Sequence, residues 1–230
     1  MTDAHARIRS SLHAPAGQER AYQPGMGRDW LLPLYDPLSR LLRLPSAHRR
    51  LIDQAAPRPN DRVLEIGCGT ANLALLVKQQ HPGTDVAGLD PDPTALARAA
   101  RKARRAGLAV RLDRGFAGAL PYPDASFDRV LSAFMFHHLD LPEKQRALRE
   151  VARVLRPGGT LHLLDFGGSP DPSDGFLARM PHHPRHVHDN AGDRIPALMR
   201  EAGLADPVET GHRVTVIGRC TFFRASRPAP

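Results

Sequence analysis

The sequence predicts an α/β fold: a mostly parallel sheet with helices on both faces, ended by an antiparallel pair of strands. Between residues 62 and 166, short apolar segments of strand length alternate with segments of helical periodicity. This alternation is typical of parallel strands whose connecting helices cover both faces of the sheet. Residues 207–225 read as two further strands with no helix between them, so we expect these two to run antiparallel to each other.

The individual elements follow from the same patterns. Apolar runs predict strands over 62–66, 85–89, 108–112, 127–133 and 160–166. Helical spacing predicts helices over 72–80, 94–106, 142–155 and 192–202. Prolines open the second of these helices and Gly107 ends it, which is the usual asymmetry of helix ends. The Arg-Pro-Gly-Gly run at 156–159 predicts a tight turn before the last parallel strand.

The chain is expected to form one domain over residues 26–230, after an N-terminal arm of residues 1–25. The arm is polar and lacks periodicity, so we expect it to be mobile. Residues 26–56 have helical spacing broken by prolines, which predicts short helices that cap the domain. Residues 167–190 are rich in Gly, Pro, Asp and His, and we expect a lid or acceptor-binding segment there.

The bulk composition limits the function without choosing one. The 230 residues carry 32 Lys and Arg against 24 Asp and Glu, a formal charge of +8, which is compatible with nucleic acid, acidic lipid or an anionic substrate. Cys68 and Cys220 lie outside any CxxC spacing, so neither a zinc site nor a disulfide framework is indicated. No apolar run approaches the ~18 residues of a membrane helix, and no signal peptide is evident. We therefore expect a soluble, cytoplasmic protein.

The first candidate site is the glycine-rich turn at residues 65–72, which follows a strand and opens a helix. Open α/β sheets bind ligands at this place, and glycine leaves room for a ligand against the backbone. Asn72 stands where a dinucleotide-binding pattern has its third glycine, and no Gly-Lys-Ser/Thr is present. The turn therefore favours a nucleoside-like ligand without a pyrophosphate, whose carboxylate could meet the amides at the helix start. The alternative is a tight turn that binds nothing.

Asp90 is the second candidate. It ends the second strand, about twenty residues past the glycines, where an acid can hold the hydroxyls of a ribose. The alternative interpretation is an acidic cap of the following helix, because Asp also satisfies free amides there. Both roles are compatible.

Several segments together resemble the motifs of class I S-adenosylmethionine-dependent methyltransferases, particularly the ubiquinone/menaquinone-biosynthesis type. They follow one another at the expected spacing at 35–38, 63–70, 88–90, 120–128 and 155–159. The resemblance covers about residues 30–166. It implies S-adenosylmethionine as the cofactor and a Rossmann-like sheet of seven strands, six parallel and one antiparallel.

The resemblance also implies cofactor-binding positions. Those at the methionine end are Glu65 beneath the cofactor, with Gly67, Gly69, Thr70, Ser132 and Ala133 around it. Asp90 would hold the ribose and Pro91 would lie against the adenine. Phe116 and Ala117 occupy the adenine edge, where many relatives have Asp or Asn instead of Phe116, so that backbone contacts or ring stacking must replace a side-chain hydrogen bond. Tyr35 would close over the cofactor.

Methyl transfer itself requires mainly that the two reactants are held in line, and a base only if the acceptor loses a proton. His137 and His138 follow the fourth strand at the mouth of the site, and imidazole suits that task. The alternative is that one of them packs structurally and the other is solvated. Phe134 and Phe136 could shape the acceptor pocket or contact the sulfonium, although core packing fits at least one of them better.

Two charged or ligating clusters have more than one interpretation. Residues 182–189 hold four histidines and an aspartate, which could bind a metal, but the prolines break helical spacing and methyl transfer needs no metal. We therefore commit to no metal site and expect a lid near the acceptor. The basic residues of 98–105 could contact RNA phosphates, but a solvated helix face fits them better.

The sequence thus favours transfer of a methyl group from S-adenosylmethionine to a small-molecule acceptor, with a quinone-like or aromatic metabolite as the type case. An RNA or protein methyltransferase is an alternative that only the basic charge supports, and we expect no nucleic-acid partner. A second alternative is a non-catalytic binding protein, towards which Phe116 points. Asn72 and the antiparallel end argue against a nicotinamide dehydrogenase. The acceptor and the oligomeric state stay open.

Overall fold

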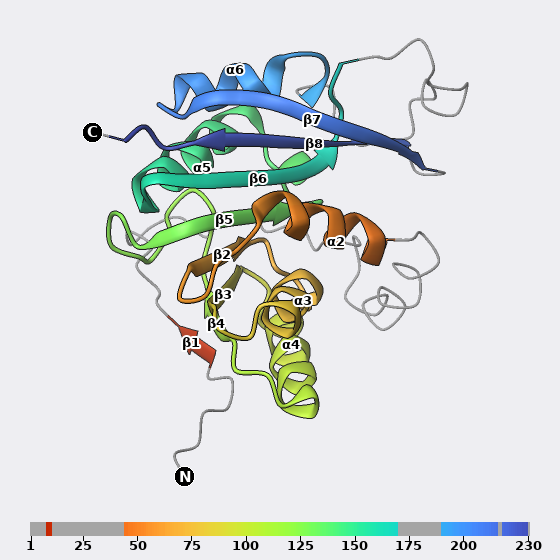
Figure 1. The fold of residues 1–230 in the computed structure, drawn as a ribbon, viewed down its shortest axis with the longest axis vertical. Helices are drawn as coiled ribbons and strands as arrows, with labels where there is room; N and C mark the ends of the chain where they lie inside the picture. Colours follow the sequence, from red (N-terminus) through yellow and green to blue (C-terminus); the bar gives the residue numbers. More distant parts are fainter. Residues whose placement is uncertain (1–7, 11–43, 170–189, 216–217, 230) are drawn as a thin grey trace.

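The computed structural model describes residues 8–10, 44–169, 190–215 and 218–229, and Figure 1 shows its fold. One eight-stranded sheet runs through the molecule in the order β1-β4-β3-β2-β5-β6-β8-β7. In that order the strands are β1 Ile8–Ser10, β4 Arg111–Arg114, β3 Asp85–Asp90, β2 Arg62–Ile66, β5 Phe127–Ala133, β6 Leu155–Phe166, β8 Gly218–Ser226 and β7 Ala205–Thr215.

The predicted seven-stranded core of the sheet is confirmed, and β1 adds an eighth strand at its edge. The pairs from β4 to β6 are parallel, whereas β8 pairs antiparallel with both β6 and β7. In β1, Ile8 pairs parallel with Leu112 of β4. No sequence pattern indicates β1, because three residues are too few for a period-2 pattern to be recognised. The rest of the predicted 1–25 arm lies outside the described residues.

Two strands, β4 and β6, begin more than two residues away from the predicted start. The third core strand, β4, covers Arg111–Arg114 rather than 108–112, because Leu108 still bonds back to helix residue Ala103 (N to O, 3.0 Å). The predicted turn at 156–159 lies inside β6 as an irregularity. Phe127 pairs with Leu155 but Arg129 pairs with Thr160, so residues 156–159 loop out between the paired positions.

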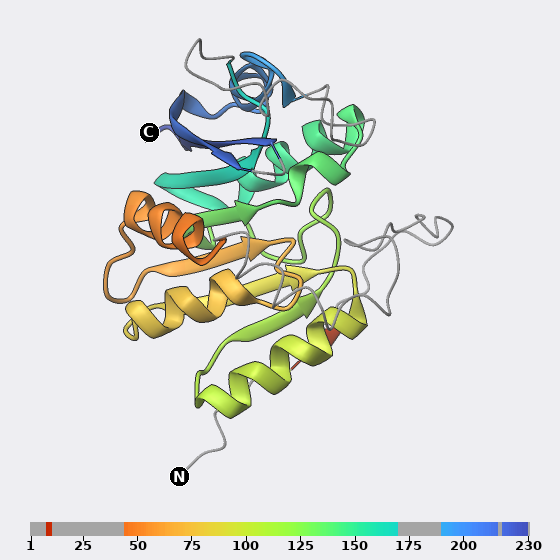
Figure 2. The same cartoon turned by 90° about the vertical axis from the view of Figure 1, so that its right-hand side faces the viewer.

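The helices cover both faces of the sheet, as predicted. They are α2 Leu44–Ala55, α3 Asn72–Gln80, α4 Pro93–Ala106, α5 Leu141–Val154 and α6 Arg194–Glu201, with a 3-10 turn, η2, at Phe136–His138. Figure 2 shows α2, α3 and α4 on one side of the sheet and α5 on the other. Residues of α2, α3 and α4 share one apolar core with the sheet, and residues of α5 and α6 share a second. Of the cap predicted over 26–56, only α2 lies within the described residues.

A buried polar cluster joins α2 to the sheet. His162 of β6 is 1% exposed, and its Nδ1 lies 3.0 Å from Gln54 Nε2 of α2. Gln54 Nε2 also donates to Phe223 O (3.1 Å), and His162 Nε2 lies 2.9 Å from Thr160 Oγ1. An amide donor at Nδ1 requires that this nitrogen accepts, so the imidazole is neutral with its proton on Nε2. Burial lowers the pKa of His162 to about 3.

This pKa predicts a pH-dependent contribution to stability. Below pH 6.5 the imidazole of His162 takes up a proton in the unfolded chain but not in the folded chain. The free energy of unfolding is therefore unaffected by titration of this histidine above pH 6.5 and falls as the pH drops towards the folded-state pKa of about 3. Between pH 7 and pH 5 this amounts to about 2 kcal/mol. We therefore expect His162→Gln, compared with the unchanged protein by urea unfolding, to gain about that much relative stability at pH 5. A difference that does not change with pH would contradict this.

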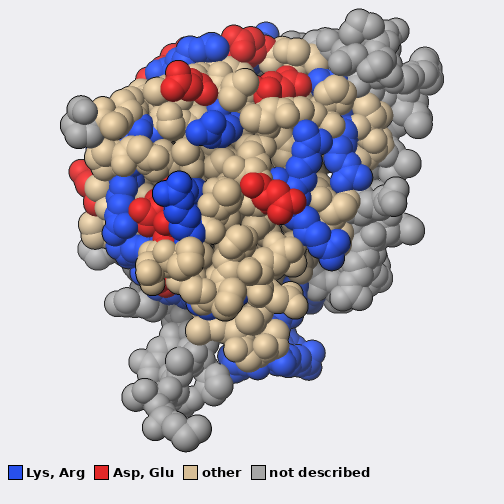
Figure 3. All heavy atoms as spheres, in the orientation of Figure 1, with Lys and Arg blue, Asp and Glu red and all other residues tan. Residues whose placement is uncertain are grey.

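The described helices include none that is both long and apolar enough to cross a membrane. The outer face of α4 is basic: Arg101, Arg104 and Arg105 are exposed, and the helix contains no acidic residue. Figure 3 shows Lys and Arg side chains gathered at the end of the molecule where Figure 1 places α4.

Candidate cofactor and methyl-transfer site

The candidate residues meet at the carboxyl ends of the parallel strands, on both sides of β2. The strand order reverses beside β2, because the chain runs outward from β2 to β3 and β4 on one side and continues from β5 to β6 on the other. Such a reversal opens the crevice in which open α/β sheets bind ligands. The glycine turn, Asp90, Ser132 and Asp165 each lie at the end of one of these strands.

The glycine turn after β2 has the backbone that the sequence predicts. Gly67 and Gly69 have φ of +69° and +50°, a left-handed conformation that favours glycine. The amides of Gly67 and Cys68 both donate to Leu89 O of β3, at 2.8 and 3.0 Å. A Cβ on Gly67 would collide with the Met135 side chain after β5. The turn is therefore held tightly between its neighbouring strands, with no room for a side chain at Gly67.

Asp90 is buried, at 7% exposed, and its carboxylate is held by backbone amides. Oδ2 accepts from Gly69 N at 2.7 Å, and Oδ1 accepts from Asp92 N at 2.9 Å. The cap of α4 is Asp92, whose side chain accepts from Thr94 N at 2.7 Å, so the cap interpretation of Asp90 is wrong. Burial raises the pKa of Asp90 to about 6. A hydroxyl-bearing ligand would meet a carboxylate already oriented by the glycine turn.

Glu65 is buried beneath the turn, at the end of β2. Its Oε2 accepts from Ala74 N in the first turn of α3 at 2.7 Å. Burial raises the pKa of Glu65 to about 8, with the hydrogen bond from Ala74 opposing that shift. The side chain is therefore poised to ionise when a cation, such as an amino group, comes to lie next to it.

Lys102 of α4 reaches the same turn, which the sequence prediction missed. Its Nζ donates to Thr70 Oγ1 at 3.2 Å and forms a short hydrogen bond with Asn72 Oδ1. The prediction of a wholly solvated basic face on this helix is therefore wrong for Lys102, although it holds for the exposed arginines. Lys102 is the one lysine among the arginines of α4, and no sequence pattern marks it as inward-facing.

The end of β5 closes the site on the side opposite β3. Ser132 is fully buried, and its hydroxyl donates to Ile66 O at 3.3 Å, which ties β5 to the end of β2. Ala133 follows it and is half-buried. Both predicted positions thus lie beside the glycine turn.

Phe116 and Ala117 lie in a tight turn after β4. Ala119 N donates to Phe116 O at 3.1 Å, and Gly115 N donates to Asp90 O at 3.2 Å, so the turn starts directly beside Asp90. Both predicted residues are half-buried. Pro91 faces the same strand, because Arg114 Nε donates to its carbonyl at 3.2 Å. The structure therefore brings the four predicted ribose and adenine positions together.

His137 is paired with a buried carboxylate that the sequence prediction did not single out. Its Nδ1 lies 2.7 Å from Oδ1 of Asp165, the penultimate residue of β6, whose side chain is fully buried. The amides of Phe136 and Phe166 donate to the Asp165 carboxylate at 2.7 Å each, and the amide of His137 donates at 3.3 Å. His138 is only partly buried, and its ring lies 4.0 Å from that of His137. Only the position of Asp165, an acid ending an apolar strand at the same sheet edge, could have indicated this pair.

Aromatic side chains surround this pair. Phe166 lies 4.9 Å from the His137 ring and 5.3 Å from the half-buried Phe134 ring. Phe134 has φ +55°, a conformation that is strained for a bulky residue and occurs preferentially at functional sites. Phe136, in contrast, is 1% exposed and belongs to the second apolar core, so core packing is confirmed for this one.

Some predicted positions lie outside the described residues. These are Tyr35, the His-rich run at 182–188 and most of the 167–190 segment. Within the parts of the chain that the structure describes, no three His, Cys, Asp or Glu side chains are grouped so as to hold a metal ion.

The sheet order and the site define a class. Three features are those of a class I S-adenosylmethionine-dependent methyltransferase. The seven-stranded core has an antiparallel strand, β8, next to its edge; the glycine turn lacks a third glycine; and an acid ends the next strand. The residues fit that cofactor, because the turn has no side chain at its glycines and carboxylates face it from two neighbouring strands.

Comparisons with known proteins agree with this class. Residues 63–159 match the family described as "Methyltransferase domain". A demethylmenaquinone methyltransferase of Thermus thermophilus is 40% identical over 65% of this chain and 69% of its own. One of Deinococcus radiodurans is 38% identical over 84% of this chain and 82% of its own. The chain therefore belongs to the S-adenosylmethionine-dependent methyltransferases of the quinone-biosynthesis type, and it is a methyl-transferring enzyme.

Solved structures show the same fold with little sequence identity. The [4+2]-cyclase SpnF aligns over 80% of this chain and 81% of its own with a TM-score of 0.65 and 21% identity. A sarcosine dimethylglycine methyltransferase from Galdieria sulphuraria, named as putative, aligns over 80% and 86% with a TM-score of 0.64 and 20% identity. Because a cyclase shares the fold, the fold alone does not identify the acceptor.

Proposed function

We propose that the enzyme methylates a quinol-like or phenolic aromatic acceptor, with His137 as the base that takes the acceptor's proton. The observation that carries this proposal is the buried pair of His137 and Asp165 beside the end of β5. The relatives support the acceptor class, since two of them are named demethylmenaquinone methyltransferases and another is a 2-phytyl-1,4-naphtoquinone methyltransferase of Synechococcus elongatus.

Asp165 orients the ring of His137. Three backbone amides fix this carboxylate, which is placed to accept a hydrogen bond from Nδ1 of the imidazole. In that tautomer the ring presents the lone pair of Nε2 to the acceptor. This nitrogen can remove the proton of a phenolic hydroxyl, which raises the electron density on that oxygen and on the ring carbon ortho to it. Methylation of the oxygen balances with the loss of this proton alone, whereas methylation of the ortho carbon also releases that carbon's own proton when the ring becomes aromatic again.

When bound, S-adenosylmethionine would supply an activated methyl group, on a sulfonium, for in-line transfer to the acceptor. The chain contributes mainly orientation, because holding both reactants in line can lower the barrier by about 7–11 kcal/mol in favourable cases. Glu65 and the residues of the glycine turn would hold the methionine end, Asp90 the ribose, and Pro91 with the turn at 116–117 the adenine. Phe134 and Phe166 would form an aromatic wall for the acceptor, next to His137.

The other expectations from the sequence are part of the same proposal. Residues 167–190 would supply the acceptor-binding segment, and Tyr35 would close over the cofactor. We place the reaction in the cytoplasm, which the buried, reduced thiols of Cys68 and Cys220 suit. We propose no nucleic-acid partner, since the relatives are named as methyltransferases of menaquinone or naphthoquinone compounds.

The test is turnover with a chosen acceptor. The purified protein is first titrated with S-adenosylmethionine in a calorimeter, with NAD as the control, and then incubated with a short-chain demethylnaphthoquinol. We expect S-adenosylhomocysteine and a product that gains one methyl by mass spectrometry, with no turnover of the oxidised quinone, which lacks the hydroxyl. Cofactor binding followed by methylation of RNA or protein, and not of quinols or phenols, would overturn the acceptor class.

A further inference from the structure

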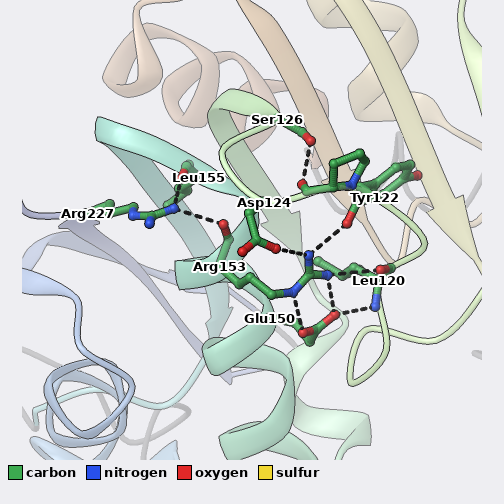
Figure 4. A network of polar contacts seen from close by, with 9 residues as sticks. Leu120, Tyr122, Asp124, Ser126, Glu150, Arg153, Leu155 and Arg227 are labelled. Carbon is green, nitrogen blue, oxygen red and sulfur yellow. Dashed lines mark hydrogen bonds and ion pairs between the residues drawn. The ribbon is translucent and has the colours of Figure 1, made fainter.

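An arginine of α5 is hydrogen-bonded to the loop that follows β4. This arginine is not among the residues assigned to the cofactor above. The guanidinium of Arg153 donates to two backbone carbonyls of this loop, Tyr122 O at 2.8 Å and Leu120 O at 3.1 Å. Glu150, one helical turn earlier, accepts from Leu120 N at 2.7 Å and from Arg153 Nη2 at 2.8 Å. Figure 4 shows Arg153 at the centre of this network, with Glu150 bridging it to Leu120.

Leu120 is therefore fixed by both of its backbone groups, and it directly follows the turn at residues 116–119. The other end of that turn is fixed as well, because Gly115 N donates to Asp90 O at 3.2 Å. The turn is thus held between the end of β3 and α5. Phe116 offers no side-chain hydrogen bond, so any hydrogen bond from this position to a ligand must come from the backbone, which is useful only when its position is fixed.

The contacts differ in strength. Asp124 pairs with Arg153 Nη1 at 2.7 Å, but its side chain is 74% exposed, and exposed pairs contribute little. Glu150 is only 21% exposed, and its hydrogen bonds with Arg153 lower the pKa of its carboxyl. Charge-assisted bonds to backbone groups are the stronger ones. The partly buried Glu150 and Arg153, rather than Asp124, therefore fix the loop.

We propose that Arg153 and Glu150 are positioning residues for the cofactor: by holding Leu120 they fix the turn at 116–119 so that its backbone recognises the adenine ring. This rests on the assignment of Phe116 and Ala117 to the adenine edge, and it does not depend on the acceptor. Neither side chain touches the cofactor in this proposal. Its consequence is that a change in α5 alters nucleobase selectivity.

The test measures selectivity rather than affinity alone. Dissociation constants for S-adenosylhomocysteine and S-inosylhomocysteine, which differ at the base edge, are measured by calorimetry without any acceptor. We expect the unchanged protein to prefer the adenine form. Arg153→Met should weaken S-adenosylhomocysteine about tenfold, the scale expected from losing charge-assisted bonds, and S-inosylhomocysteine much less, so that the preference falls. Asp124→Ala, which removes only the exposed pair, should leave both constants unchanged.

Glu150→Ala, which removes the acceptor of Leu120 N, should also lower the preference for S-adenosylhomocysteine over S-inosylhomocysteine. This variant provides the test if Arg153→Met does not fold. Equal weakening of both ligands alongside a lower melting temperature would show a merely structural role and overturn the proposal. An unchanged preference in both folded variants, or no preference in the unchanged protein, would overturn it too. Because no acceptor is used, failure here is distinguishable from failure of the proposed quinol methylation.

Discussion

Replacing His137 with alanine is expected to lower kcat with a quinol acceptor by about 10²–10⁴-fold, the usual contribution of a general base. Cofactor affinity should stay the same, because the side chain of His137 is bonded to Asp165, whereas the glycine turn is bonded to Asp90. Steady-state kinetics combined with calorimetric titration of S-adenosylhomocysteine measure the two quantities separately. Normal turnover by a folded His137→Ala protein would contradict the assignment of His137 as the general base.

The neighbouring residues provide matched controls for this prediction. Asp165→Asn removes the carboxylate that accepts the Nδ1 proton, so it should also lower kcat, on the order of 10²-fold, by disturbing the tautomer and orientation of His137. His138→Ala removes the adjacent ring, 4.0 Å away, and should have a much smaller effect. The reverse pattern, with His138→Ala the more damaging, would instead identify His138 as the base.

Replacing Asp90 with alanine is expected to weaken S-adenosylmethionine binding at least tenfold with the fold retained. The carboxylate is expected to bind the ribose, and it also accepts from Gly69 N, so the variant loses a ligand contact and a support of the glycine turn. Because burial raises the pKa of Asp90 to about 6, affinity in the unchanged protein should also decline as the pH falls below 6 and the carboxyl takes up a proton.

Asp92→Ala is the matched control for this second prediction. Asp92 caps α4 through Thr94 N and makes no side-chain contact with the glycine turn, so its loss should reduce stability by about 1 kcal/mol and leave cofactor affinity unchanged. Circular dichroism checks the fold of both variants, and calorimetry measures their affinity. Unchanged affinity in Asp90→Ala would mean that the ribose site lies elsewhere.

The sequence by itself determined the elements whose signals are local. The alternation of apolar strands and amphipathic helices defined the sheet core and its covered faces, and β2 and α3 have the predicted boundaries. The glycine turn and Asp90 were also recognisable, because a strand that ends in glycines or an acid places them at the sheet edge wherever the strand lies. The edge strand β1 was not, since three residues carry no period.

Only the tertiary structure decided which side chains meet. Asp165 and His137 are 28 residues apart, Lys102 and Thr70 are 32 apart, and Arg153 and Leu120 are 33 apart. Each of these pairs joins residues from different elements, so the sheet order and helix packing set their distance, and no sequence spacing encodes it. The base, the support of the glycine turn and the control of the adenine-side loop depend on such pairs. A chain's local pattern fixes where its strands end, whereas the free energy of packing the whole sheet fixes what lies beside those ends.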